Sequence, residues 1–146
     1  MIEPIVLDSY PLSLLCHPNR NKPGVEAMRR QARRWWDAGR TICIAEIADY
    51  EVRRELLRVG KPVSLRRLDQ LYTQLRFLPL DSAVMRRSAE LWAKARREGI
   101  PTAPPEALDG DVILAAQADA VGAIIATDNI AHLSRYGRAV RWQEFL

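Results

Sequence analysis

The sequence has few of the residues from which soft-metal and nucleophilic sites are built. Cys16 and Cys43 are its only cysteines, and their spacing matches no metal-binding motif, so we expect two reduced thiols. Cys43 lies in the apolar stretch TICIAEI, which places it in the expected core. His17 and His132 are the only histidines, and His132 is better explained as a structural polar residue than as a catalytic base.

Several sequence motifs are absent as well. The sequence contains no G-x-S-x-G, which argues against a Ser–His–Asp hydrolase, and no G-x-x-x-x-G-K-[ST] or G-x-G-x-x-G, which argues against nucleotide binding. No apolar run reaches the roughly 18–20 residues that span a bilayer. The first ten residues carry an acid and a proline where a signal peptide carries basic residues. We therefore expect a cytoplasmic protein with no membrane partner.

What is present is the composition of a globular protein. The 146 residues are 48% hydrophobic and 27% charged, which predicts one domain over residues 1–146 with one core. The net charge is +4, and 19 of the 22 basic residues are arginines. An arginine-rich surface suits RNA or an acidic protein partner. Many of these arginines lie among acids in expected helices, where a solvated face with weak ion pairs is the simpler explanation for any single one.

Short β-branched runs alternate along the chain with segments of helical periodicity. Strands are expected at 4–8, 41–45, 76–80, 123–128 and 139–146, and helices at 12–15, 24–39, 46–60, 64–75, 81–99 and 108–122. Residues 100–106 (IPTAPPE) are expected to interrupt regular structure. This alternation predicts an α/β domain with a mainly parallel sheet.

Acidic residues follow the ends of several expected strands. Asp8 ends the first strand, Glu46 follows the second, and Asp128 and Asn129 follow the strand AIIAT. In an open parallel sheet, sites form beyond the carboxyl ends of the strands. Each residue alone has an ordinary structural explanation, such as a turn or a first-turn helix acid. Their convergence on one sheet edge predicts a site there.

Asp109 and Asp111 stand at the start of an almost wholly apolar helix. The partial positive charge of a helix N-terminus stabilises a carboxylate at the border of the core. Two residues apart correspond to about 200° around a helix, so the two side chains cannot point the same way. One of them is expected to cap the helix and the other to reach the site. Asp is a preferred cap, so capping alone also explains Asp109.

Crowded carboxylates repel one another unless a cation compensates their charge. Hard oxygen ligands without a cysteine or histidine cluster favour Mg²⁺ or Mn²⁺ over zinc. Such an ion activates water and neutralises the charge that develops on a phosphodiester. The residues therefore indicate metal-assisted phosphodiester hydrolysis, with Asp8, Glu46 and Asp111 as principal metal ligands and Asp109 and Asp128 as additional candidates.

The order and spacing of these acids resemble the PIN-domain nucleases, especially the VapC-like toxins of bacterial toxin–antitoxin pairs. IVLDSY resembles the first family motif, with its acid at Asp8 and a small hydroxyl residue at Ser9. IAEI resembles the second motif, with its acid at Glu46, and DVILAAQA resembles the Asp-led, Ala-rich helix that begins at Asp111. IIATDNIAHL resembles the last motif, in which a hydroxyl residue precedes an Asp or Asn by two positions, here Thr127 and Asn129.

The resemblance implies a three-layer α/β/α fold with a four- to five-stranded, mainly parallel sheet. It also implies a Mg²⁺- or Mn²⁺-dependent ribonuclease with Asp8, Glu46, Asp111 and Asn129 as catalytic residues and Ser9 and Thr127 as auxiliary ones. Toxin members form homodimers and are silenced by a cognate antitoxin whose tail enters the acidic cleft. Two features depart from the pattern. Tyr10-Pro11 follows Asp8 and Ser9 where many members carry Asn or a small residue, and Asp128 adds a carboxylate beside Asn129. Either Asp128 or Asn129 can face the metal.

These departures keep a second interpretation open, in which the chain is a non-catalytic PIN-like module that binds RNA or protein. A basic aromatic stretch bears on the partners of both. Trp35 and Trp36 follow RRQARR on one expected helix, so one ring is expected in the core and the other partly exposed. The exposed ring fits a protein contact better than RNA stacking. The four arginines of this stretch suit phosphates or an acidic antitoxin tail.

Overall fold

Five strands form one sheet in the computed structural model, which describes residues 2–100 and 109–145. They are β1 (Ile5–Leu7), β2 (Ile42–Ala45), β3 (Arg76–Leu78), β4 (Ile124–Thr127) and β5 (Ala139–Arg141). Their order across the sheet is β3-β2-β1-β4-β5, and each neighbouring pair is parallel. Because all five strands run the same way, every carboxyl end lies at one edge of the sheet.

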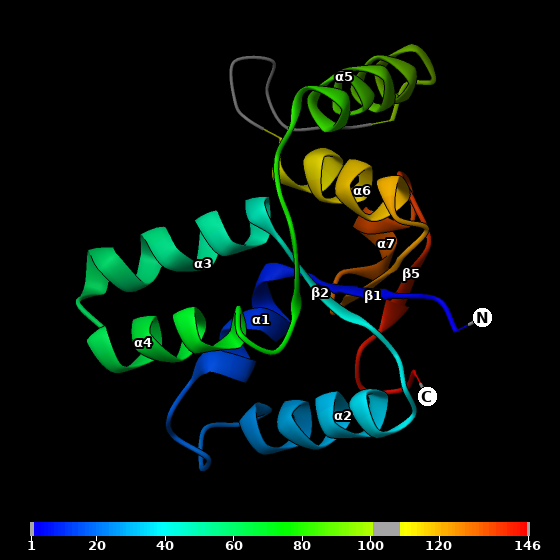
Figure 1. Cartoon of the computed structure of the whole chain (residues 1–146). Coiled ribbons are helices and arrows are strands. Elements are labelled where there is room, and N and C mark those ends of the chain that lie inside the picture. Colours follow the sequence, from blue (N-terminus) through cyan, green and yellow to red (C-terminus); the bar gives the residue numbers. More distant parts are fainter. Residues whose placement is uncertain (1, 101–108, 146) are drawn as a thin grey trace.

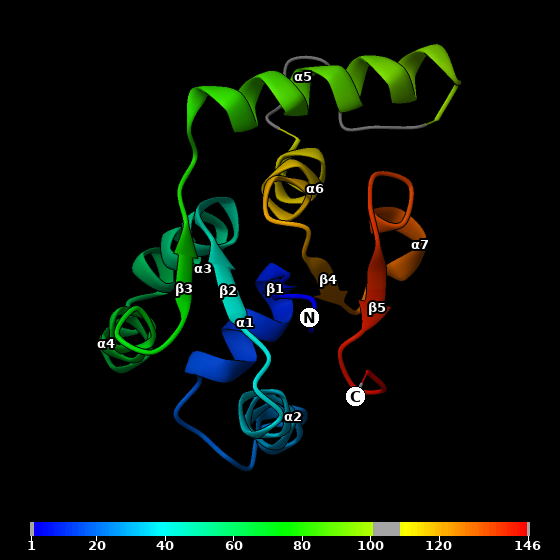
Figure 2. The same cartoon turned by 45° about the vertical axis from the view of Figure 1, so that its right-hand side comes forward.

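Helices cover both faces of this sheet, which gives the three-layer α/β/α arrangement that the family resemblance implies (Figures 1 and 2). Helices α5 and α6 lie on one side of the sheet, and α1, α2 and α4 lie on the other. Among the described residues the helices are α1 (Ser9–Cys16), α2 (Val25–Asp37), α3 (Glu46–Val59), α4 (Pro62–Leu71), α5 (Ser82–Arg97), α6 (Gly110–Ala120) and α7 (Ile130–Leu133). No helix in this part of the chain is both long and apolar enough for a membrane span.

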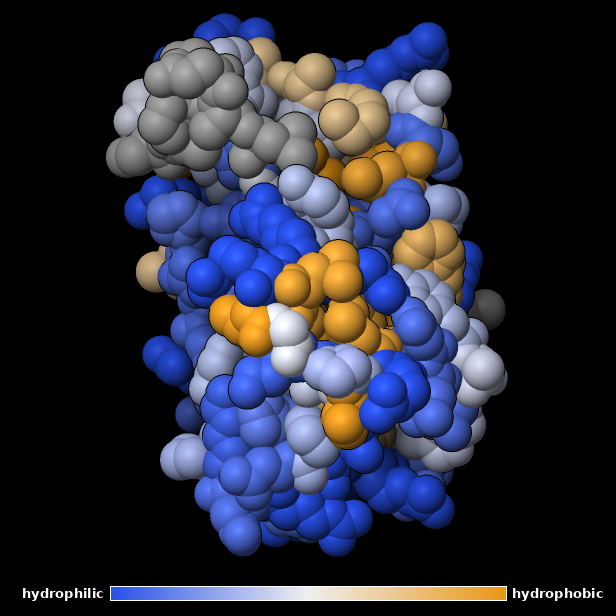
Figure 3. All heavy atoms as spheres, turned by 90° about the vertical axis from the view of Figure 1, so that its left-hand side faces the viewer, coloured by the Kyte–Doolittle hydropathy of each residue, from blue (hydrophilic) through white to orange (hydrophobic). Residues whose placement is uncertain are grey.

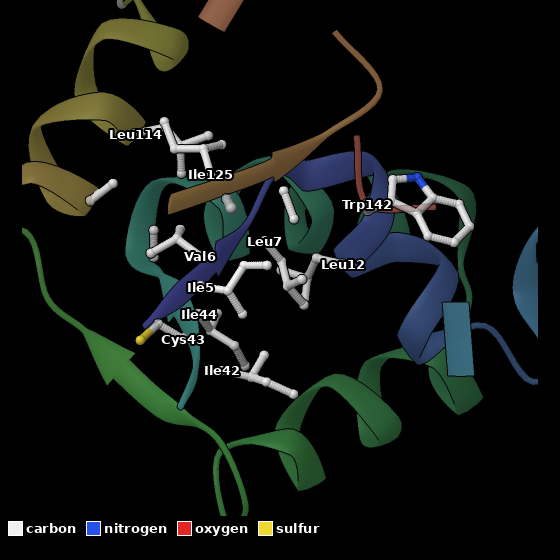
Figure 4. Packing of buried hydrophobic residues seen from close by; sticks show 14 of the residues in the cluster. Ile5, Val6, Leu7, Leu12, Ile42, Cys43, Ile44, Leu114, Ile125 and Trp142 are labelled. Carbon is white, nitrogen blue, oxygen red and sulfur yellow. The ribbon is translucent and has the colours of Figure 1, made fainter. Parts of the chain in front are cut away.

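The three central strands are fully buried, as their continuous apolar runs predict. Successive side chains of a strand point to opposite faces, so β1 supplies both halves of the core. Figure 4 shows Val6 on one side of the strand, with Leu114 of α6 packed near Ile125, and Leu7 on the other side beside Leu12 of α1. The sheet is therefore a rigid base from which side chains at its carboxyl edge project.

The observed elements differ from the expected ones mainly at their ends. Helix α1 begins at Ser9, three residues before the expected start, and Pro11 lies in its first turn, where a missing N–H costs no helical hydrogen bond. The four-residue helix α7 was not expected, and β5 ends at Arg141 instead of reaching residue 146. Most of the expected break at residues 100–106 lies outside the described residues.

The pair of tryptophans behaves as the helical pattern predicts. Trp35 on α2 is 1% exposed and belongs to the core, whereas Trp36 is 50% exposed. The Trp35 indole N–H also donates to the carbonyl oxygen of Phe145 at 2.9 Å, which fastens the C-terminal segment to α2.

Candidate functional site

The side chain of Asp8 stands at the junction of β1 and α1, where it is the N-cap of the helix. One carboxylate oxygen accepts a hydrogen bond from the backbone N–H of Ser9 at 2.8 Å. The other accepts a hydrogen bond from the Thr127 hydroxyl at 2.7 Å. That hydroxyl in turn accepts the backbone N–H of Asn129 at 2.8 Å. Strand β4, which is paired with β1, therefore fixes the orientation of the Asp8 carboxylate.

The two acids at the start of α6 take different positions in the helix. Asp109 is the N-cap, and its carboxylate accepts the backbone N–H of Val112 at 3.3 Å. Asp111 lies in the first turn of the helix, with a carboxylate oxygen 3.6 Å from Nε2 of His132 on α7. Burial raises the pKa of Asp111, and the negative charge of Asp8 raises it further. Asp8 and Asp111, 103 residues apart in sequence, are thus electrostatic neighbours at the same edge of the sheet.

A third acid of this group, Glu51 on α3, is absent from the sequence-based site. Burial raises the pKa of Glu51, and the charges of Asp8 and Asp111 raise it in turn. Its carboxylate also lies against the N-terminus of α6, because a Cβ placed on Gly110 would lie 2.9 Å from Glu51 Oε2. Asp8, Glu51 and Asp111 therefore form one cluster, which we call the acid cluster.

Glu46, the acid that the sequence assigns to α3, faces a different part of the molecule. Its Oε1 accepts the backbone N–H of Leu80 at 2.7 Å, so it fastens the connection between β3 and α5 to the start of α3. Five residues correspond to about 140° around a helix, so Glu46 and Glu51 cannot both face Asp8. The charged neighbours of Glu51 are therefore Asp8 and Asp111, whereas Glu46 is directed at the backbone of Leu80.

A signal for Glu51 was present in the sequence. The buried residues of α3 include Ile47, Ala48 and Val52, and Glu51 lies four positions after the first and three after the second. Glu51 is therefore a carboxylate on the inward face of the helix, where charged side chains are uncommon unless they are paired or functional. The position of Glu46 directly after β2 makes it the more obvious candidate for the site in the sequence.

The two candidates after β4 are also held differently. Asp128 Oδ1 accepts the Gln143 side-chain amide at 2.7 Å, which commits it to the C-terminal segment. Asn129 is the N-cap of α7, and its backbone N–H is the group that holds Thr127. Thr127 is completely buried, so its hydroxyl is a fixed link between Asn129 and Asp8.

The buried amide of Gln117 sets the position of α6 against the rest of the site. This side chain is 1% exposed. Its Nε2 donates to the carbonyl oxygen of Leu78 at 2.7 Å, and its Oε1 accepts the backbone N–H of Ile47 at 3.2 Å. Helix α6 is therefore tied to β3 and to the first turn of α3, which keeps Asp111 and Glu51 on facing elements.

The acid cluster suits a hard divalent cation in its chemistry. All three ligand candidates are carboxylates, and the raised pKa values of Asp111 and Glu51 show that burial and mutual repulsion disfavour their charged forms. Among residues 2–100 and 109–145, no group of three or more His, Cys, Asp or Glu side chains is arranged closely enough to hold a metal ion as it stands. The fit therefore rests on donor type and charge.

The protein is thus a five-stranded parallel α/β domain with a cluster of carboxylates beyond the carboxyl ends of its strands. The sequence profile of the PIN domain matches residues 25–138, so the chain belongs to the PIN domain family. No curated protein matches the sequence.

Solved structures of VapC and VapBC proteins share the fold. A chain of VapBC2 from Rickettsia felis, bound to a fragment of its promoter DNA, matches with a TM-score of 0.76 at 18% identity over 97% of this chain and 99% of that one. A chain of DNA-bound VapBC from Salmonella typhimurium matches with a TM-score of 0.74 at 22% identity and the same coverage. VapC20 of Mycobacterium tuberculosis, a toxin that cleaves the sarcin–ricin loop, matches with a TM-score of 0.62 at 15% identity over 94% and 98% of the two chains.

Proposed function

We propose that the protein is a Mg²⁺- or Mn²⁺-dependent endoribonuclease that hydrolyses RNA phosphodiester bonds. The observation that carries the proposal is the acid cluster, in which burial and the negative charge of Asp8 raise the pKa values of Glu51 and Asp111 at the edge where parallel sheets place their sites. The likeness to VapC20, which cleaves RNA, supports the choice of substrate.

In this proposal Asp8, Glu51 and Asp111 are the residues that would hold the divalent ion. A bound ion would supply charge neutralisation at the scissile phosphate and an activated water. Thr127 keeps the Asp8 carboxylate in one orientation, and Asn129 holds Thr127 through its backbone N–H. Ser9 contributes its backbone N–H to the same carboxylate, whereas Asp109 acts as a helix cap.

The test is cleavage of a labelled single-stranded oligoribonucleotide by the purified protein. We expect cleavage with Mn²⁺ or Mg²⁺ and none with EDTA. Asp8→Asn and Asp111→Asn should each lower the rate roughly 100-fold or more, because each removes a charge on which the ion depends. Asp37→Asn is the matched control, since Asp37 forms an exposed ion pair with Arg33 on α2. Full activity of both site variants contradicts the proposal.

We further propose that the protein is the toxin of a VapBC-type pair, with a cognate antitoxin as its protein partner and a homodimer as its assembled state. Three of the solved neighbours are VapBC complexes, which supports the antitoxin. An apolar cavity of about 520 Å³, lined in part by Tyr50, Leu57 and Leu80, offers a surface for the second copy. Leu57 is 63% exposed, so Leu57→Lys should convert a dimer to a monomer in light scattering without unfolding it.

A non-catalytic PIN-like module is the second candidate. The observation that favours it is that the carboxylates do not form a ready-made group of three metal ligands in the described chain. Titration calorimetry with Mn²⁺ separates the two functions. Binding that Asp8→Asn abolishes supports the nuclease, and the absence of binding with or without RNA supports the module.

A further inference from the structure

A group of basic side chains gathers at the end of α1 opposite the acid cluster. It comprises His17 at the C-cap of α1, Lys22 in the loop before α2, Arg29 on α2, Lys61 before α4, and Arg67 on α4. We call these five residues the α1-end cluster. The α1–α2 loop and the α3–α4 turn lie on the left of Figure 1, and this side faces the viewer in Figure 3. Its lower part, below the orange patch, is almost entirely hydrophilic.

Backbone contacts hold the first members of the α1-end cluster in place. Arg29 Nη2 donates to the carbonyl oxygen of His17 at 2.7 Å, which joins α2 to the end of α1. The backbone N–H of Asn19 donates to His17 Nδ1 at 3.0 Å. Since Nδ1 accepts this hydrogen bond, the ring proton is assigned to Nε2, which leaves an N–H donor on the free side of the imidazole.

The cationic charges of the α1-end cluster lie close enough to act on one another. The pKa of His17 is lowered by burial and then by the charges of Lys22, Lys61, Arg29 and Arg67. The pKa of Arg29 is lowered by burial and then by Arg67 and Arg20, with Glu26 as the opposing charge. The fold therefore keeps these cations close together although their positive charges repel one another.

Two guanidinium groups of the α1-end cluster also have unused donors. The Nε atoms of Arg29 and Arg67 are buried and have no hydrogen-bond partner in the described part of the chain. A buried N–H donor without an acceptor lowers the stability of the folded protein, so such donors are uncommon in native structures. Arg53, on the neighbouring helix α3, is the contrast, since its Nε donates to Asp49 at 3.1 Å and its Nη2 lies 2.8 Å from Asp69.

We propose that the α1-end cluster binds phosphate groups of the RNA backbone, at a second site separate from the acid cluster. The assignment rests on the proposed function for its choice of RNA. Helix α1 has eight residues, so about 12 Å of helix separates Asp8 at its N-cap from His17 at its C-cap. An RNA strand whose scissile phosphate lies at Asp8 carries further phosphates along this distance. Arginine and lysine donors from separate elements suit a chain of tetrahedral anions.

The first experiment measures binding without cleavage. A fluorescein-labelled single-stranded oligoribonucleotide of mixed sequence is titrated in EDTA with protein carrying Asp8→Asn, and anisotropy is read at several salt concentrations. Lys22→Gln, Lys61→Gln and Arg67→Gln are added together in the test protein. Arg86→Gln, Lys94→Gln and Arg97→Gln, three exposed cations on α5, are introduced together in the control, so both proteins lose the same net charge.

We expect the test protein to bind the RNA roughly tenfold or more weakly than its parent, and the slope of log K against log salt to fall by about 2, or about 0.7 for each lost phosphate contact. The control should change both quantities much less. Equal changes in the two proteins overturn the proposal, because the effect is then one of net charge. Circular dichroism confirms that both are folded. A loss of binding to polyglutamate with unchanged RNA binding also overturns it, in favour of an acidic protein partner.

A second experiment does not depend on any substitution. The Arg Nε–Hε signals of the unaltered protein are followed by NMR as inorganic phosphate is added. We expect those of Arg29 and Arg67 to shift and that of Arg53, which is paired with Asp49, to remain in place. Unmoved Arg29 and Arg67 signals contradict the phosphate site. If the protein binds RNA through the α1-end cluster but does not cleave it, the phosphate site is supported and the proposed nuclease function is contradicted.

Discussion

At the scale of single residues, Glu46 and Glu51 give a matched pair of acids on one helix. Glu46→Gln keeps a side-chain oxygen that can accept the Leu80 N–H, so RNA cleavage should stay within about twofold of the unaltered protein. Glu51→Gln removes a negative charge from the acid cluster, and cleavage should fall roughly 100-fold or more. Single-turnover cleavage rates with Mn²⁺ check both expectations. The reverse ranking would return the role to Glu46.

Gly110 gives a second residue-scale prediction, because it makes room for the carboxylate of Glu51. Gly110 lies in the first turn of α6 with no positive φ, so Ala fits the helix and favours it by up to about 1 kcal/mol. The added Cβ would lie 2.9 Å from Glu51 Oε2, at the end of a flexible side chain that can move aside. Gly110→Ala should therefore maintain or raise the melting temperature and lower Mn²⁺-dependent cleavage.

The measurement for Gly110→Ala is a thermal melt beside a cleavage assay. Gly122→Ala is unsuitable as a control because Gly122 has φ 65°, a left-handed conformation that Ala tolerates poorly. Ala120→Gly, at the far end of α6, changes helix propensity without reaching Glu51. A Gly110→Ala protein with unchanged cleavage would show that Glu51 works equally well when displaced.

Local patterns explain which residues of the acid cluster could be predicted. Asp8 directly follows the buried strand β1 and Thr127 is the last residue of the buried strand β4, so strand direction alone places them together. Asp111 follows from helix capping, since only one acid of the pair can cap. Glu51 depends on how α3 is rotated against α1 and α6. That rotation is set by packing between elements distant in sequence, and the hydrogen bonds of Gln117 are part of it.

At the scale of elements, Gln117 is the side chain that ties α6 to two neighbours. Gln117→Leu keeps a similar volume but leaves the Leu78 carbonyl and the Ile47 N–H without their partner. Each unsatisfied group costs about 1–3 kcal/mol, so the free energy of unfolding should fall by roughly 2–6 kcal/mol. Urea denaturation measures this. Gln70→Leu, at an exposed position of α4, is the control and should change stability by less than about 0.5 kcal/mol.

The strength of each element's own pattern decided which elements the sequence could predict. Strands β1, β2 and β4 are buried on both faces and stand out as apolar runs. Strand β5 has only three residues and is partly exposed, so its sequence pattern does not show where it ends. Its end is set by its pairing with β4, and the last paired residue of β5 is Arg141. Helix α7 has four residues, too few for a periodic pattern, and it forms where Asn129 and Thr127 turn the chain.

At the scale of the whole molecule, opposite charges lie at the two ends of α1. The acid cluster is at its N-terminal end and the α1-end cluster is at its C-terminal end. Each group is under internal repulsion, so the fold holds both at some cost in stability. Functional sites commonly carry such a cost, and substitutions that relieve it stabilise the protein while they remove its activity.

This cost predicts how stability depends on pH. Burial and neighbouring charge raise the pKa values of Asp111 and Glu51 in the folded protein. A carboxyl with a raised folded pKa stabilises the fold fully below its unfolded pKa of about 4, and this contribution is lost as the pH rises through the folded pKa. At pH 7 the ionised carboxylates of Asp111 and Glu51 therefore lower the stability of the fold. The doubly neutral protein Asp111→Asn, Glu51→Gln should melt on the order of 2–4 °C higher than the unaltered protein at pH 7.

At about pH 3 the carboxyls of the unaltered protein are protonated as well, so the difference in melting temperature should disappear. Mn²⁺ at pH 7 should raise the melting temperature of the unaltered protein, because an ion that binds only the folded state stabilises it, and it should leave the doubly neutral protein unchanged. Melts at the two pH values, with and without Mn²⁺, measure both effects. A melting difference that is equal at pH 3 and pH 7 would show that packing, rather than charge repulsion between the three acids, is what the substitutions alter.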